Sequence, residues 1–215
     1  MTEPMTMNRL IHGAVRRDLD RLSAALGQLT DGDRARAQDL QRAFANLRRE
    51  LTHHHDGEDT HIWPMLSKVG VDPDLLSTME AEHHTMAEAL AETDTAMATV
   101  ARTGSAADAE AARVSVVRTQ EVVNGHLAHE ETELEPQLHR YTDTPEWKAV
   151  EKKLSRQPPG VAGQFFAWLT DGMSDEHRAF LKQTVPTPVV SLLATLFGRR
   201  YNREVAPVWR TSAKV

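Results

Sequence analysis

Apolar residues recur three and four positions apart through most of the chain, whereas the strict alternation of a β-strand is rare. This spacing places apolar side chains along one face of an α-helix. It marks two helices on either side of the turn sequence LTDGD at 29–33, one through Leu19, Leu22 and Leu26 and the other through Ala43, Leu47 and Leu51. The pattern therefore predicts an all-α protein.

Two further helices follow. The third opens within VDPDLLSTME, which starts at residue 71, with Asp72 as the expected N-cap and Pro73 at the first helical position. The sequence RTGSAAD at 102–108 separates it from a fourth helix, which runs to about Arg140 and ends near TDTPEW. Long helices with short connections are typical of an up-down-up-down four-helix bundle, here over residues 1–141.

The rest of the chain predicts a helical C-terminal extension. The segment SRQPPGVAG at 155–163 is rich in Pro and Gly and is the best boundary. We expect the bundle at 1–141, a linker at 142–163 and the extension at 164–215, with a second break at VPTPVV, residues 185–190.

The extension carries an apolar stripe at helical spacing, formed by Val189, Leu192, Leu193 and Leu196 and continued by Phe197, Tyr201 and Val205. The favoured interpretation is a helix packed back on the bundle. A contact between copies in a homo-oligomer is the next alternative. A basic amphipathic helix at a membrane, with Arg199, Arg200 and Arg203 beside the apolar face, is the least favoured.

Charge and composition narrow the function classes. The net charge of −6 and the pI of about 6.0 indicate neither a nucleic-acid partner nor a polybasic membrane contact. The first residues lack an apolar signal segment, and no apolar run approaches the roughly 20 residues that span a bilayer, so we expect a cytoplasmic protein. The absence of cysteine excludes disulfides, thiolate ligands, iron–sulfur clusters and cysteine nucleophiles.

The candidate chemistry lies in HHHDGEDTHIWP at 53–64, and an internal repeat shows how to interpret it. The segments LTHHHDGEDTHIWPML at 51–66 and VNGHLAHEETELEPQL at 123–138 match at an offset of 72. The offset places His54 on His126, Glu58 on Glu130, Asp59 on Glu131 and Pro64 on Pro136. At an offset of 71, His12 falls on His83 and Leu19 on Leu90.

The repeat predicts six side chains that converge in one core. Residues four apart on an α-helix point in nearly the same direction, about 40° apart around the axis and about 6 Å along it. Each His-x-x-x-Glu pair therefore faces one way, and two helix pairs related by a pseudo-twofold axis aim all of them inward. The converging residues are His12, His54, Glu58, His83, His126 and Glu130.

A single His-x-x-x-Glu is usually no more than a solvated helix face, but its repetition in matching register favours a metal site. Buried unpaired carboxylates and imidazoles destabilise a core unless a cation compensates them. Two bridging glutamates with two histidines per ion would make a dinuclear site suited to iron.

Four segments, IHGAV, HHHDGEDTHIWP, EAEHHTM and HLAHEETELEP, together resemble the hemerythrin-like (HHE cation-binding) family over residues 1 to about 141. The resemblance implies a non-haem diiron centre inside a four-helix bundle that meets O2 or related small molecules. It further implies that the terminal iron ligands are His12, His54, His83 and His126, and that the bridging carboxylates are Glu58 and Glu130.

The chain departs from the oxygen-carrying members of that family at one ligand. Those members have a second histidine four residues after the one on the third helix, and here that position is Ala87. Either one iron lacks an imidazole, or His55, or else His129 or Glu131, supplies a ligand. Fewer histidines would leave more open positions, which favours reactivity over reversible O2 storage.

Other residues are expected to have supporting or structural roles. His53, His61, His84 and His139 should face solvent or stand behind the ligands, and His177 lies outside the resemblance. Trp63 precedes Pro64, as an aromatic usually does in the family, and is expected in the core or at a helix end.

The expected function is a diiron protein that binds, senses or reacts with O2, peroxide or nitric oxide; as an enzyme it would consume peroxide or nitric oxide slowly. One alternative is a ferritin-like diiron carboxylate oxidase, whose Glu-x-x-His mark occurs at Glu50–His53 and Glu80–His83. The other is a helical interaction bundle with incidental histidines.

Overall fold

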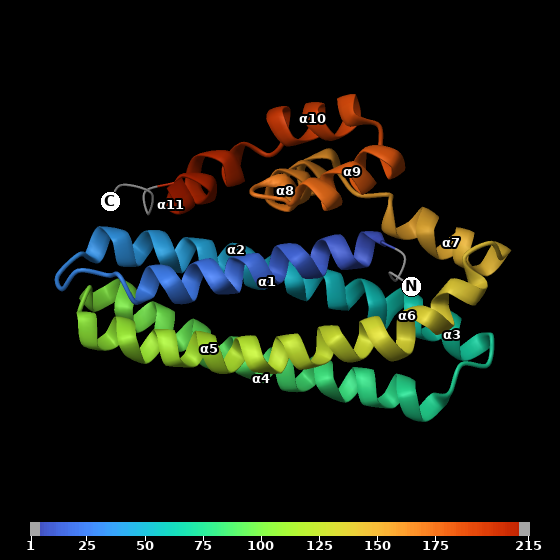
Figure 1. Cartoon of the computed structure of the whole chain (residues 1–215), viewed down its shortest axis with the longest axis horizontal. Coiled ribbons are helices and arrows are strands. Elements are labelled where there is room, and N and C mark those ends of the chain that lie inside the picture. The colour runs from blue at the N-terminus through green and yellow to red at the C-terminus, as the bar shows by residue number, and fades with distance from the viewer. Residues whose placement is uncertain (1–4, 211–215) are drawn as a thin grey trace.

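The computed structural model describes residues 5–210, and every regular element in that range is a helix (Figure 1). The four long ones are α1 (Met7–Leu26), α2 (Arg34–Gly57), α4 (Pro73–Thr103) and α5 (Ala106–His129). Both α4 and α1 pack against α2 and α5, so the four helices surround one core. The predicted all-α class is confirmed; the expected domain ranges also include residues 1–4 and 211–215, which lie outside the described part.

Side-chain caps fix where these helices begin. Thr6, Asp33 and Ser105 each accept a hydrogen bond from the backbone N–H three residues later. Asp72 accepts from the N–H of Asp74 and is followed by Pro73, as the sequence predicts. The connection from α4 to α5 passes through Gly104, whose positive φ of 70° favours glycine.

Short elements extend α2 and α5 beyond the core. They are the π-helical segments η1 (Glu58–Ile62) and η2 (Glu130–Leu134), then α3 (Trp63–Lys68), α6 (Glu135–Leu138) and the 3₁₀ segment η3 (His139–Tyr141). Helix α7 (Pro145–Leu154) follows, within the stretch expected to be a linker, and packs against α3.

The predicted apolar faces of the bundle form its core. The leucines of α1 named above are at most 2% exposed, and Ala43, Leu47 and Leu51 of α2 are fully buried. Burial of a leucine side chain stabilises a fold by about 1.5 to 3 kcal/mol, so this core dominates the stability of the bundle. Within residues 5–210, every helix falls short of the length and apolarity that a bilayer crossing requires.

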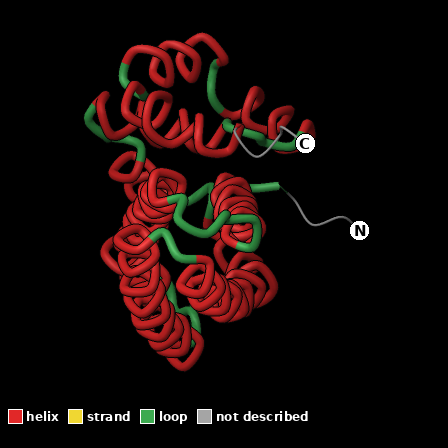
Figure 2. The backbone as a smooth tube through the Cα atoms, turned by 90° about the vertical axis from the view of Figure 1, so that its left-hand side faces the viewer, coloured by secondary structure: helices red, strands yellow, loops and turns green. Residues whose placement is uncertain are grey.

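The extension forms a second layer over α1 and α2 (Figures 1 and 2). Its elements are α8 (Pro159–Thr170), α9 (Asp175–Thr184), α10 (Thr187–Leu196), η4 (Tyr201–Val205) and α11 (Ala206–Arg210). Helix α8 packs against α1, η4 and α11 pack against α2, and α10 packs against α8. The extension thus rests on α1 and α2.

The apolar stripe of the extension is divided between two surfaces. Tyr201 and Val205 are buried, whereas Val189, Leu192, Leu196 and Phe197 are more than 40% exposed. Helix α10 ends at Leu196, so the residues beyond it follow a new direction toward α2. The extension packs on the bundle as the favoured interpretation held, but through η4 rather than through the outer face of α10.

Candidate metal centre

The candidate centre lies where all four long helices meet in the bundle core. Helix α1 supplies His12 and α4 supplies His83, while His126 is in the last turn of α5. Helix α2 supplies two successive histidines, His54 and His55, in its last turn. The carboxylates come from Glu58 and Glu130, the first residues of the two π-helical segments.

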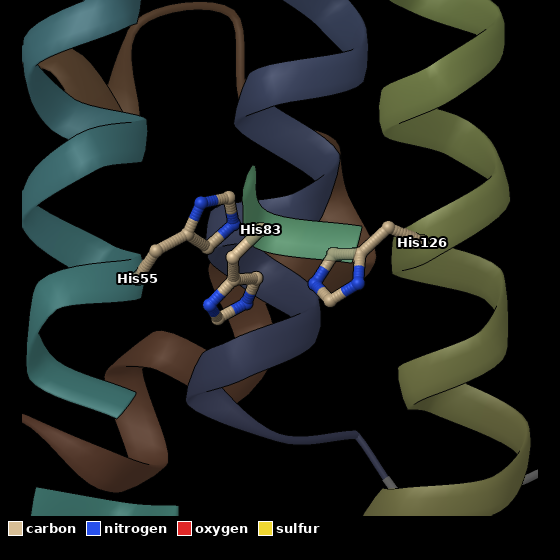
Figure 3. Close-up of side chains that lie close together, drawn as sticks. All are labelled: His55, His83 and His126. Atoms are coloured by element: carbon tan, nitrogen blue, oxygen red, sulfur yellow. The ribbon is translucent and has the colours of Figure 1, made fainter. Parts of the chain in front are cut away.

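The five histidines can be divided between two ends of the centre, which a third close group, His54, His55 and Glu58, connects. His55, His83 and His126 each offer a ring nitrogen within 4.8 Å of the others, and we name this group the three-histidine end. Figure 3 shows these rings turned toward one another from three helices. His12 and His54 form the two-histidine end, where their Nε2 atoms lie 3.3 Å apart and Glu130 completes a second group.

The two glutamates join these ends. Glu58 places Oε1 3.4 Å from Nε2 of His54 and Oε2 3.6 Å from Nε2 of His83, so its two oxygens face different ends. Glu130 places Oε2 3.2 Å from Nε2 of His12 and 3.9 Å from Nε2 of His126. Ligands of one ion at about 2.1 Å are separated by roughly 3 to 4 Å, so these spacings fit two cations.

Unsatisfied polar atoms test whether a metal fits here. Buried polar atoms normally have a hydrogen-bond partner, and each exception requires an explanation. Of the nine buried side-chain atoms without a partner among the described residues, five lie close together: Nε2 of His55, His83 and His126 and Oε2 of Glu58 and Glu130. All five belong to the centre, and all are donor atoms with lone pairs for a cation. The residues present therefore fit a metal.

The electrostatics of the centre point to the same conclusion. Burial and the adjacent Glu130 carboxylate raise the pKa of Glu58 well above its usual range. Burial, together with repulsion from the other rings, lowers the pKa of His54 to about 3. A buried carboxylate that resists ionisation beside imidazoles that resist protonation is a site that a cation stabilises.

Comparison with known proteins agrees with this geometry. The hemerythrin HHE cation-binding domain model matches residues 7–138, which cover the bundle and every residue of the centre. The chain belongs to the hemerythrin HHE cation-binding domain family. No curated protein and no solved structure matches it. The family binds metal cations, and the His and Glu groups of the centre lie within the matched residues.

Three carboxylates stand behind the histidines of this hemerythrin-family centre. Asp59 lies 2.9 Å from Nδ1 of His83, and Glu82 lies 2.9 Å from Nδ1 of His126. Glu131 lies 2.7 Å from Nδ1 of His12. A carboxylate on one ring nitrogen fixes the ring and leaves the other nitrogen free for a metal.

Charged partners also keep the carboxyl group of Glu131 ionised. Burial alone would raise the pKa of its carboxyl, but hydrogen bonds from His12 and from the Arg16 guanidinium lower that pKa to about 2. The Arg16 nitrogens lie 2.7 and 3.2 Å from the two oxygens of Glu131. Burial of His12 would lower the pKa of its ring, but the carboxylates of Glu130 and Glu131 outweigh that effect and raise it.

The π-helical segments lie at equivalent places in the two halves of the hemerythrin-family repeat. In each, a backbone N–H bonds to the carbonyl five residues earlier, from Trp63 to Glu58 and from Glu135 to Glu130. A proline follows each segment at Pro64 and Pro136, and a proline ring clashes with the carbonyl four residues before it in a regular α-helix. The wider turn avoids that clash, and its first residue is the glutamate of the centre.

The structure brings together all six residues that the repeat singles out, and it adds His55. The three residues considered as replacements for the imidazole missing at position 87 differ in position. His55 points into the three-histidine end, where its ring stacks on that of His83 with centroids 4.1 Å apart. Glu131 and His129 stand one layer back, on His12 and on Glu82.

The remaining candidates lie around this layer. His53 and His84 are exposed, and His61 and His139 are partly buried. Trp63 is buried and stacks on the ring of His83, with centroids 5.8 Å apart. His177 belongs to α9 and touches Gly13, where an added Cβ would lie 2.5 Å from its ring.

Sequence reasoning missed Glu82 and Asn8. Asn8 donates from Nδ2 to Oε1 of Glu130 at 3.0 Å and thereby orients the carboxylate. Neither residue has a like partner in the repeat, which aligns Glu82 with Ile11 and Asn8 with Met79. The one available signal was the position of Glu82 directly before His83.

Proposed function

We propose that this chain is a non-haem diiron protein that binds and reacts with O2 or a related small oxidant such as peroxide or nitric oxide. The observation that carries the proposal is the pair of histidine groups joined by two carboxylates, Glu58 and Glu130. The up-down-up-down path expected of the four helices fits this arrangement, since each helix contributes to one shared core.

The donor set favours iron. Imidazole and carboxylate ligands suit iron, and the cysteine-free chain offers no thiolate to select zinc or a softer metal. We assign the three-histidine end to one ion and the two-histidine end to the other. When bound, the pair of irons supplies redox chemistry and an open coordination position for a small ligand.

The protein's own residues prepare the place where such a ligand would arrive. The two-histidine end offers one imidazole fewer, so the open position falls beside His12 and His54. His54 is the least buried of the five rings, with 10% of its side chain exposed. The side chains of the centre are buried in the apolar core, which favours access by small molecules over larger ones.

His55 bears on whether the protein would carry O2 reversibly or react with it. The expectation of an extra open position rested on a missing imidazole, and His55 lies where it can restore the fifth histidine. Reactivity is then expected from the two-histidine end alone. Among the described residues, the titratable groups directly behind the ligands, Glu82, His129 and Glu131, are held in hydrogen bonds, so we expect slow turnover of peroxide or nitric oxide.

A ferritin-like oxidase is not favoured. Glu50 is bonded to Arg49, and Glu80 is exposed, so neither Glu-x-x-His glutamate faces the centre. The donor groups that do face it are five histidines and two glutamates. This is a histidine-rich set, whereas the ferritin-like set is dominated by carboxylates.

The test is anaerobic loading with Fe²⁺ followed by metal analysis and stopped-flow absorption on mixing with O2 or peroxide. We expect about two irons per chain and a rapid change to a diferric spectrum that azide perturbs. Binding of one iron or none by folded protein would contradict the diiron proposal. A long-lived band reversible on removal of O2 would instead indicate a carrier.

A further inference from the structure

The carboxylates behind the histidines follow an order around the bundle. Each is the sequence neighbour of a ligand on one helix and supports a ligand on the next. Asp59, beside Glu58, holds His83 of α4, and Glu82, beside His83, holds His126 of α5. Glu131, beside Glu130, then holds His12 of α1.

The fourth link of this series is missing. At the offset of 71, the position of Glu82 corresponds to Ile11, whose side chain cannot accept a hydrogen bond from the ring of His54. At the offset of 72, His129 corresponds to Gly57. The six ligands that the repeat predicts are therefore matched between its halves, whereas their supporting carboxylates are not, and Glu82 is unmatched just as His55 is.

Glu82 is held on both of its oxygens. Oε2 lies 2.9 Å from Nδ1 of His126, and Oε1 lies 2.8 Å from Nδ1 of His129. An ionised carboxylate only accepts hydrogen bonds, so both rings donate from Nδ1. His126 is therefore left with its lone pair on Nε2, which is the buried atom that faces the centre.

The partners of Glu82 also differ from those of Glu131, the carboxylate that supports His12 at the two-histidine end. Glu131 shares its carboxylate with the guanidinium of Arg16, which neutralises it. The partners that the structure gives Glu82 are imidazoles alone. A carboxylate without a cationic partner makes the imidazole that it contacts a stronger electron donor to a metal.

We propose that Glu82 is a positioning residue that fixes His126 for metal binding and strengthens the three-histidine end, so that the two ion positions differ in affinity. The inference rests on the proposed dinuclear centre. Loss of the charge in Glu82→Gln should weaken one of the two bound ions, and the expected loss is about 10- to 100-fold, as for other residues that support metal-bound histidines.

The experiment is a competitive titration of the metal-free protein with Co²⁺ against a chelator, with the visible spectrum as the readout. Glu82→Gln should lose affinity at one step only and show an altered cobalt spectrum. Glu80→Gln is the matched control, because it removes an exposed carboxylate two residues away on α4. Equal two-step binding in Glu82→Gln and wild type, or equal losses in both variants, would overturn the proposal.

A second measurement needs no variant and stands even if Glu82→Gln fails to fold. Nitrogen-15 NMR of the Zn²⁺-loaded wild-type protein should place the proton of His126 on Nδ1, and a proton on Nε2 would overturn the proposal. The two inferences fail separately. Wild type that binds fewer than two Co²⁺ ions contradicts the dinuclear centre, whereas wild type that binds two while Glu82→Gln matches it contradicts only the role of Glu82.

Discussion

The indole Nε1 of Trp168 donates a 2.8 Å hydrogen bond to Oδ2 of Asp18, and both residues are fully buried between α8 and α1. Oδ1 of the same carboxylate accepts from Arg17 at 2.8 Å. A buried carboxylate is tolerated when its lone pairs are satisfied, and here two of its partners come from different parts of the chain. This pair is one polar contact that holds the extension on the bundle, beside those of Arg17 with the Trp168 carbonyl and Arg36 with the Val208 carbonyl.

Trp168→Phe should lower the free energy of unfolding by about 1 to 3 kcal/mol, because it leaves a buried acceptor without its donor. Urea denaturation followed by circular dichroism measures the change. Trp147→Phe serves as the control, since that tryptophan is only partly buried and lies in α7, away from this contact. Equal stability losses in the two variants would show that the hydrogen bond to Asp18 is unimportant.

His55→Ala should reduce the iron content from about two per chain toward one. Its ring is the only one from α2 at the three-histidine end, so its loss weakens that ion and spares the pair at the other end. Metal analysis after anaerobic loading gives the stoichiometry. The neighbouring exposed His53, changed to Ala, should retain both ions. Full loading of His55→Ala would remove His55 from the ligand set.

Metal removal should lower the melting temperature. The centre brings buried carboxylates and imidazoles together, and a ligand that binds only the folded state stabilises it by about 4 kcal/mol at a thousandfold excess over Kd. Differential scanning calorimetry of metal-free and loaded protein measures the shift. Glu130→Ala should lose most of this shift and His177→Ala should keep it. Identical melting of loaded and metal-free wild type would contradict a buried centre.

Pro64→Ala should weaken metal binding without lowering the stability of the metal-free protein. Alanine removes the clash that favours the wider turn and has a higher helix propensity, so η1 can relax toward a regular α-helix and turn Glu58 away. Chelator competition and chemical denaturation give the two quantities. Pro145→Ala, at the start of α7, is the control. Unchanged metal affinity in Pro64→Ala would show that the turn does not place Glu58.

The convergence of the six repeat residues could be predicted because spacing fixes direction within a helix. His54 and Glu58 share a face whatever surrounds them, and the offset of 72 extends that argument to His126 and Glu130. His55 could not be assigned in this way. A residue one position along is turned by about 100°, so its role depends on how closely α4 and α5 approach α2.

Contacts between distant segments escaped prediction for a related reason. Asp18 and Trp168 are 150 residues apart, and no local pattern pairs them. The apolar stripe from Val189 to Val205 was predicted to share one face, but the helix ends at Leu196 and the chain changes direction. Helical periodicity holds only within an unbroken helix, so the orientation of η4 had to come from the structure.

The bond between His12 and Glu131 joins residues 119 positions apart in the chain. During synthesis, the first histidine of the centre therefore emerges from the ribosome long before its supporting carboxylate. Neither histidine end of the centre is complete until both halves of the bundle have been made and docked. Under the proposed function, metal insertion would thus be a late step in the life of the nascent chain, after the two halves of the repeat have met.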